Sequence, residues 1–166
     1  MICGTLALHR FNGIERFEIK TAKMFLLGDP GNYTLWFELE TTNEASVRNE
    51  DTAGHPATPS LSVGVTLTEF SVDTLVGSEL HHAGIPCEAS EEDEDVSGVE
   101  GQDSCEALMY YYEHQPLRDV RIAITGRSED GFIVRGTATT PDVNFYDGSA
   151  PDTKVEIEAV FSWCDG

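Results

Sequence analysis

Residues 2–20 read ICGTLALHRFNGIERFEIK, and this stretch decides the fold class. Two extended runs flank Asn12-Gly13, a dipeptide that supplies the positive φ angles of a tight type I′ turn. The pattern predicts that Ile2–Arg10 pairs with Ile14–Lys20 as an antiparallel hairpin. A chain that starts in this way is expected to continue as an antiparallel β protein.

Apolar and polar residues alternate with a period of two through much of the remaining chain. A further short strand is expected at Ala22–Leu27, before a Pro-Gly turn at residues 28–32, and another turn at residues 128–131. Such alternation buries one face of a sheet and exposes the other. It is clearest in residues 33–40, 61–68, 120–125 and 155–163.

Two segments are ambiguous. Ser71–Leu80 has helical spacing interrupted by Gly77, and residues 103–114 fit either a capped helix or a strand. The tyrosine run favours a strand at Leu108–His114. The sequence thus predicts a mostly-β, single-domain antiparallel β-sandwich or distorted barrel over residues 1–166. We expect about eight or nine strands and at most one or two short helices.

The charge of the chain is large and uneven. Thirty acids and ten bases give a formal net charge of -20, and no lysine or arginine occurs from Asn49 to Leu117. A negative field of this size favours basic partners and cations, and it disfavours nucleic acid and anionic membranes. A second interpretation is adaptation of the surface to high salt, since ions screen an acidic surface and keep it soluble.

The densest acidic run is the first candidate site, and we expect it in a mobile loop at about 86–102. Its carboxylates would contact the basic groups of a partner. The run also begins like a calcium loop, but the twelfth position is Ser104 rather than a glutamate, so no metal site is predicted. Scattered histidines and cysteines lack the spacing of a zinc site, and no cofactor is expected. The partner-binding candidates are Glu91, Glu92, Asp93, Glu94 and Asp95.

The second candidate site is the segment 140–153, TPDVNFYDGSAPDT. Its acids and amide could converge on a cation, and an aromatic ring could support a carbohydrate. The alternative is a structured connection in which these side chains bond their own backbone. The ligand-binding candidates are Asp142, Asn144, Tyr146 and Asp147.

Four cysteines, Cys3, Cys87, Cys105 and Cys164, are expected to be reduced in a cytoplasmic protein, because the N-terminus lacks the pattern of a secretory signal. If oxidised, Cys87 with Cys105 and Cys3 with Cys164 would be the natural pairs. Trp36 falls on the polar side of its strand. It marks either a binding face or a second covering layer.

No nucleophile elbow, P-loop, zinc-protease motif or dinucleotide fingerprint occurs, so no catalytic residues and no enzymatic activity are predicted. The expected function is a non-enzymatic binding domain, such as an acidic inhibitor- or immunity-type protein that covers a basic protein. The alternative is a small-ligand domain that binds carbohydrate or a cation through the 140–153 loop.

Overall fold

The computed structural model describes residues 3–10, 13–42, 59–82, 107–111, 113–141 and 152–165. These residues form ten strands and one 3₁₀ helix, Val72–Thr74. The mostly-β prediction is confirmed, with ten strands in place of eight or nine. The strands are β1 (Gly4–Arg10), β2 (Gly13–Asp29), β3 (Asn32–Thr41), β4 (Ser60–Leu67), β5 (Glu79–His82), β6 (Ala107–Tyr111), β7 (Glu113–Pro116), β8 (Arg118–Ser128), β9 (Gly131–Thr140) and β10 (Thr153–Trp163).

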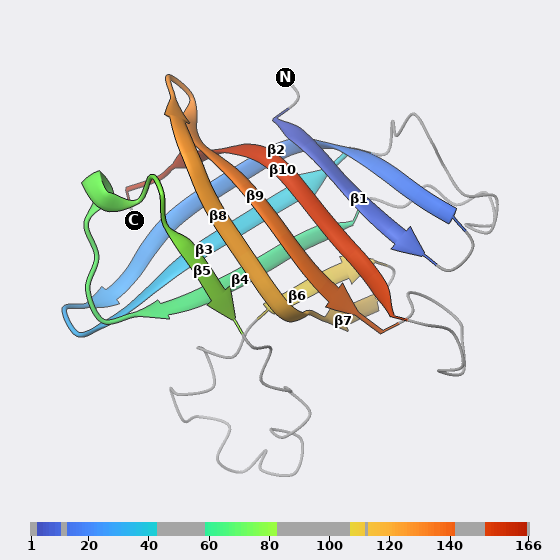
Figure 1. Ribbon diagram of the computed structural model, residues 1–166, viewed down its shortest axis with the longest axis horizontal. Coiled ribbons are helices and arrows are strands. Elements are labelled where there is room, and N and C mark those ends of the chain that lie inside the picture. The colour runs from blue at the N-terminus through green and yellow to red at the C-terminus, as the bar shows by residue number, and fades with distance from the viewer. Residues whose placement is uncertain are drawn as a thin grey trace, which may run out of the picture.

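All ten strands belong to one sheet, in the order β5-β8-β9-β10-β1-β2-β3-β4-β6-β7. Neighbours in this order are antiparallel, and a short parallel contact also joins the end of β10 to the middle of β2. The sheet curls over itself, so that β8, β9, β10 and β1 form a front layer that crosses β3, β4, β6 and β7 behind (Figure 1). Among the described residues no ladder joins β7 to β8 or β5, so the curled sheet stays open.

The long strand β2 carries the sheet from the front layer to the back layer. Its first half, up to Ile19, pairs with β1, and its second half, from Thr21, runs along β3. The ladder shifts register between these residues, which places a β-bulge at Lys20. The prediction of two strands, Ile14–Lys20 and Ala22–Leu27, is therefore wrong in one respect. They are one bent strand, because a bulge and not a turn separates them.

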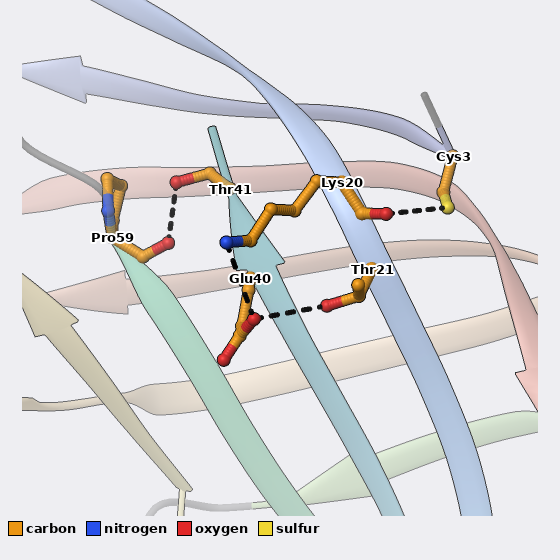
Figure 2. A network of polar contacts seen from close by, with 6 residues as sticks. All are labelled: Cys3, Lys20, Thr21, Glu40, Thr41 and Pro59. Atoms are coloured by element: carbon orange, nitrogen blue, oxygen red, sulfur yellow. Dashed lines mark hydrogen bonds and ion pairs between the residues drawn. The ribbon is translucent and has the colours of Figure 1, made fainter. Parts of the chain in front are cut away.

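Polar contacts on both sides hold this bulge (Figure 2). Lys20 Nζ lies 3.8 Å from Glu40 Oε2, and the Thr21 hydroxyl donates to the same oxygen over 3.5 Å. On the other side, the Cys3 thiol donates to the carbonyl oxygen of Lys20 over 3.5 Å. The extra residue is thus tied both to β3 and to the residue that precedes β1.

The predicted pairing of the first hairpin is confirmed, but Gly13 belongs to the second strand rather than to the connection. Arg10 pairs with Gly13, so the connecting residues are Phe11 and Asn12, and Gly13 is the first residue of β2. Gly13 has a φ angle of 141°, a conformation that residues with a Cβ rarely adopt. The glycine is needed at the start of the strand rather than inside the turn.

The two ambiguous segments also resolve into strands. The helical spacing of Ser71–Leu80 yields only the single turn Val72–Thr74, after which β5 begins at Glu79. The strand predicted at Leu108–His114 is confirmed as strand structure, but it is divided into β6 and β7, which pair as a hairpin.

The core lies between the two layers of the curled sheet. Phe37 of β3 meets Phe161 of β10 edge to face, with ring centroids 5.7 Å apart. The space left beside this pair is about 20 Å³, room for about one water molecule at most. Side chains of the described strands therefore fill the interior. The largest fully buried ones are Phe17, Phe37, Phe132, Phe161, Leu6, Leu8, Ile19, Met24, Leu35, Leu39 and Met109.

A buried ion pair lies at the end of the core beside the β1–β2 connection. Arg10 Nη1 is 3.3 Å from Glu15 Oε1, and the two side chains are 2% and 0% exposed. Strand alternation places both on the core face, in line with Leu8 and Phe17. Since a buried charge costs several kcal/mol without its partner, each side chain depends on the other.

We expect Gly13→Val to destabilise the protein by about 1–3 kcal/mol, because a β-branched residue is strained at this φ angle. Denaturant unfolding followed by circular dichroism measures the change. Ile14→Val, at the neighbouring position of the same strand, is the control and should cost much less. Wild-type stability of Gly13→Val would contradict this backbone conformation.

We expect Arg10→Met to destabilise the protein by about 3–5 kcal/mol, because the buried Glu15 carboxylate would lose its ion pair with Arg10. The double variant Arg10→Met with Glu15→Leu should recover much of this loss, since no buried charge remains. Urea unfolding of the single and double variants tests the pair. A double variant less stable than the single one would show that the two charges are not coupled in this way.

Candidate functional site

Both candidate sites from the sequence lie outside the described residues. This holds for the acidic run Glu91–Asp95, and likewise for Asp142, Asn144, Tyr146 and Asp147. What the structure does give is the position of the strand ends from which these segments leave the sheet.

The strand ends that flank the undescribed segments gather at one end of the sheet. The registers place the end of β1 beside the start of β2 and the start of β10, and the start of β10 beside the end of β9. The start of β4 lies between the end of β3 and the end of β6, and the end of β5 lies beside the start of β8. The start of β6 pairs with Val63 in the middle of β4, and the Ala107 carbonyl oxygen accepts from Leu117 N directly before β8. We call this the connection end. The β2–β3 and β8–β9 turns lie elsewhere, the first at the lower left and the second at the top of Figure 1.

The acidic residues are also distributed unevenly between the described sheet and the segments outside it. The described residues contain sixteen of the thirty acids and nine of the ten bases. The residues outside them contain the other fourteen acids and a single base, Arg48. The sheet itself is therefore moderately acidic, and most of the excess negative charge belongs to segments attached at the connection end.

Polar side chains also line the inner side of the connection end. The buried Thr41 hydroxyl donates to the carbonyl oxygen of Pro59 over 2.7 Å (Figure 2), and the Thr140 hydroxyl donates to that of Pro116 over the same distance. Thr153 is fully buried, and its hydroxyl has no hydrogen-bond partner among the described residues. Together with the Arg10–Glu15 pair, these polar groups form the boundary of the apolar core at the connection end.

A groove of about 270 Å³ runs along the outer face of β4, next to the connection end. Its floor is formed by the outward residues of β4, which are small, and its two sides by longer side chains of β3 and β6. Two rows of cross-strand neighbours build it: Glu40, Ser60 and Tyr110 in one row, and Glu38, Ser62 and Leu108 in the next.

Trp36 lies further along the same face. The sequence predicts that it lies on the outer side of its strand, and the structure agrees: it is half-buried and faces Gly64 of β4. A Cβ atom at Gly64 would lie 3.0 Å from the indole ring, so with any larger residue the ring would have to shift by a few tenths of an ångström. The groove along β4 therefore has an indole beside it, beyond the rows of Glu38 and Glu40.

The front layer carries two further hollows on its outer face, of about 240 and 440 Å³, which share Arg135, Gly136 and Thr137. Both contain charges of both signs, and some of these charges form ion pairs. Arg135 Nε lies 3.1 Å from Glu158 Oε2, and Glu156 contacts both Lys154 and His9. Glu156 and Glu158 of the front face therefore already contact basic side chains, as Glu40 of the β4 groove does.

Asp119 marks the point where the chain enters β8. Its φ angle of 50° makes it the one described residue other than glycine with a positive φ, and the β8–β9 register shifts beside it. His81 Nε2 lies 2.8 Å and Arg121 Nη2 lies 3.2 Å from Asp119 Oδ1. The hydrogen bond from His81 lowers the pKa of the Asp119 carboxyl, and Arg121 acts in the same direction.

No group of three or more potential metal ligands occurs within the described part of the chain. Cys3 and Cys164 are free thiols, while Cys87 and Cys105 lie outside the described residues. In the described ranges, no helix has the length and apolar character required to cross a bilayer.

Sequence reasoning missed the groove along β4. It identified the alternation of β3 and β4 but not the lateral neighbours of these strands. A signal was present, because the outward residues Ser60, Ser62 and Gly64 are all small, and a strand with a small-residue face leaves a hollow between larger neighbours.

We expect Asp119→Asn to lower the melting temperature near pH 6, because the ionised carboxylate accepts from His81 and pairs with Arg121. Asparagine tolerates the same positive φ angle, so the substitution removes the charge without adding backbone strain. Since the folded-state pKa is lowered, the carboxylate stabilises the fold above its ordinary pKa of 3.8 and loses this effect as the pH falls through the lower value. The difference between wild type and variant should shrink in melting scans towards pH 3. A difference that does not change with pH would contradict this role.

No protein-family model, no curated protein and no solved structure matches this chain. Its function is therefore inferred from its geometry and its charge.

Proposed function

We propose that this domain is a non-enzymatic binding protein that covers a basic protein partner, in the manner of an inhibitor or immunity protein. The observation that carries the proposal is the division of charge. Fourteen acids and one base lie in the segments outside the described sheet, and the strands place the attachment points of these segments at one end.

A concentration of negative charge at one end makes the electrostatic field of the molecule asymmetric, with the most negative potential at that end. A basic protein that approaches this end is attracted and oriented before contact, which raises the association rate and makes it depend on salt. The sheet supports this role because side chains of the described strands fill its core. Binding on the surface, rather than in the interior, is the mode that this architecture favours.

A small-ligand site and adaptation to high salt both compete with this proposal. The small-ligand function uses the 140–153 loop and stays a prediction, because Asp142, Asn144, Tyr146 and Asp147 lie outside the described residues. Adaptation to high salt would account for the acidity without any partner. It differs in its consequence, because it demands no complex with a basic protein and predicts a fold that becomes more stable as salt rises.

The test is capture of basic proteins from a native lysate of the source cells by the immobilised domain. We expect a basic protein to be retained at low salt, released at high salt, and recovered with the domain as a complex of fixed stoichiometry in gel filtration. If the domain retains no basic protein at low salt, the proposal fails.

A variant with residues 88–103 replaced by a short Gly/Ser connection serves as the control for the acidic run. The fold should survive, since loop length changes the closure entropy only slowly and the described strands are untouched. Capture should weaken strongly. An unrelated protein of equal net charge, immobilised at the same density, corrects for simple ion exchange.

A further inference from the structure

The groove along β4 has one acidic side and one apolar side. Glu38 and Glu40 project from β3, while Leu108 and Tyr110 project from β6, and the short side chains of Ser60 and Ser62 lie between them. Adjacent strands are about 4.8 Å apart, so the two sides are separated by about 10 Å at the backbone. That width admits one extended chain or a row of long side chains.

The two carboxylates differ in what they contact. Glu40 is held by Lys20 and Thr21, as Figure 2 shows. Glu38 is exposed, and although Lys23 of β2 is its cross-strand neighbour, the two form no ion pair within 4.0 Å. A carboxylate that faces the groove without a direct ion pair favours a cationic occupant.

The spacing of the carboxylates points to a chain conformation. Glu38 and Glu40 are two residues apart on one face of β3, a separation of about 6.4–6.8 Å. Alternate side chains of an extended segment have the same separation. A segment that lies along β4 would thus present the first and third of three consecutive residues to these two carboxylates.

We propose that the groove along β4 binds an extended segment of the basic partner with arginines at alternate positions. This inference rests on the proposed function and names the contact surface within the described sheet. The guanidinium groups pair with Glu38 and Glu40, and the arginine stems and planar heads lie over Leu108 and Tyr110.

Arginine fits this groove better than lysine does. Its planar head donates two parallel hydrogen bonds to one carboxylate, and it stacks on an aromatic face. Tyr110 is 47% exposed, which leaves much of its side chain accessible. A cation over an exposed tyrosine contributes about 0.5–1 kcal/mol in addition to the ion pair.

A second copy of this chain is disfavoured as the occupant. The chain has a net charge of -20, and the groove itself is acidic. Bringing two such surfaces together would place like charges side by side, which opposes association. The charge therefore selects a different, basic protein.

Two peptides of identical composition test the inference. Acetyl-Gly-Arg-Ser-Arg-Gly-amide places both arginines on one side of an extended chain, whereas acetyl-Gly-Arg-Arg-Ser-Gly-amide places them on opposite sides. Binding of each to the full chain is measured by NMR titration. We expect the alternating peptide to bind at least about threefold more tightly and to shift the backbone resonances of β3, β4 and β6.

Matched variants locate the contact. Glu38→Gln should weaken binding of the alternating peptide about fivefold and abolish its advantage over the adjacent one. Glu129→Gln makes the same change of charge in the β8–β9 turn, and it should leave the advantage intact. Tyr110→Ala should also reduce binding, and the unfolding curves of all three variants show whether each is folded.

The outcomes separate this inference from the proposed function. Equal binding of the two peptides, equal effects of Glu38→Gln and Glu129→Gln, or no peptide binding would overturn the groove as the contact surface. If the intact domain still captures a basic protein, the proposed function stands in that case. If it captures none, both proposals fail.

Discussion

Side chains alternate along a strand, so a strand that passes from one layer to another keeps its apolar residues inside only if the alternation is reset. In β2 the buried positions are odd-numbered up to Ile19 and even-numbered from Ala22 onwards. The extra residue at the bulge makes this change. Without it, either Phe17 or Met24 would face solvent, and the two layers could not share one core.

The second passage between the layers, from β7 to β8, has the same construction. Leu117 and Val120 are both buried, although they are three residues apart, and the ladder shifts register between Arg118 and Arg121. Asp119 lies at this register shift and adopts a left-handed backbone conformation. Its side chain contacts His81 of β5. Each passage is thus a bulge with a polar side-chain contact beside it, Lys20–Glu40 in one and His81–Asp119 in the other.

Alternation is sufficient to predict the mostly-β class and the positions of most strands, because local side-chain period reports which face is buried. Alternation fails as a guide where the buried positions of one strand switch from odd to even numbers, so the sequence of β2 resembles two strands. It also fails where strands are very short, so the four residues of β5 are hidden in a helical spacing and the β6–β7 hairpin resembles one strand. The groove requires lateral neighbours: Glu40, Ser60 and Tyr110 are far apart in sequence, and only the registers of two ladders bring them into one row. The predicted sites in the connections stay predictions, because the described residues do not include them.

The grouping of attachment points at one end has a consequence for how such a protein can change over generations. Connections tolerate insertions and substitutions much better than core strands do. Here the segments with most of the charge leave the sheet at the connection end, while the two bulges and the Phe37–Phe161 contact belong to the strands. Substitutions in those segments leave both bulges and the Phe37–Phe161 contact in place, so the charge at this end can change over generations with little loss of stability.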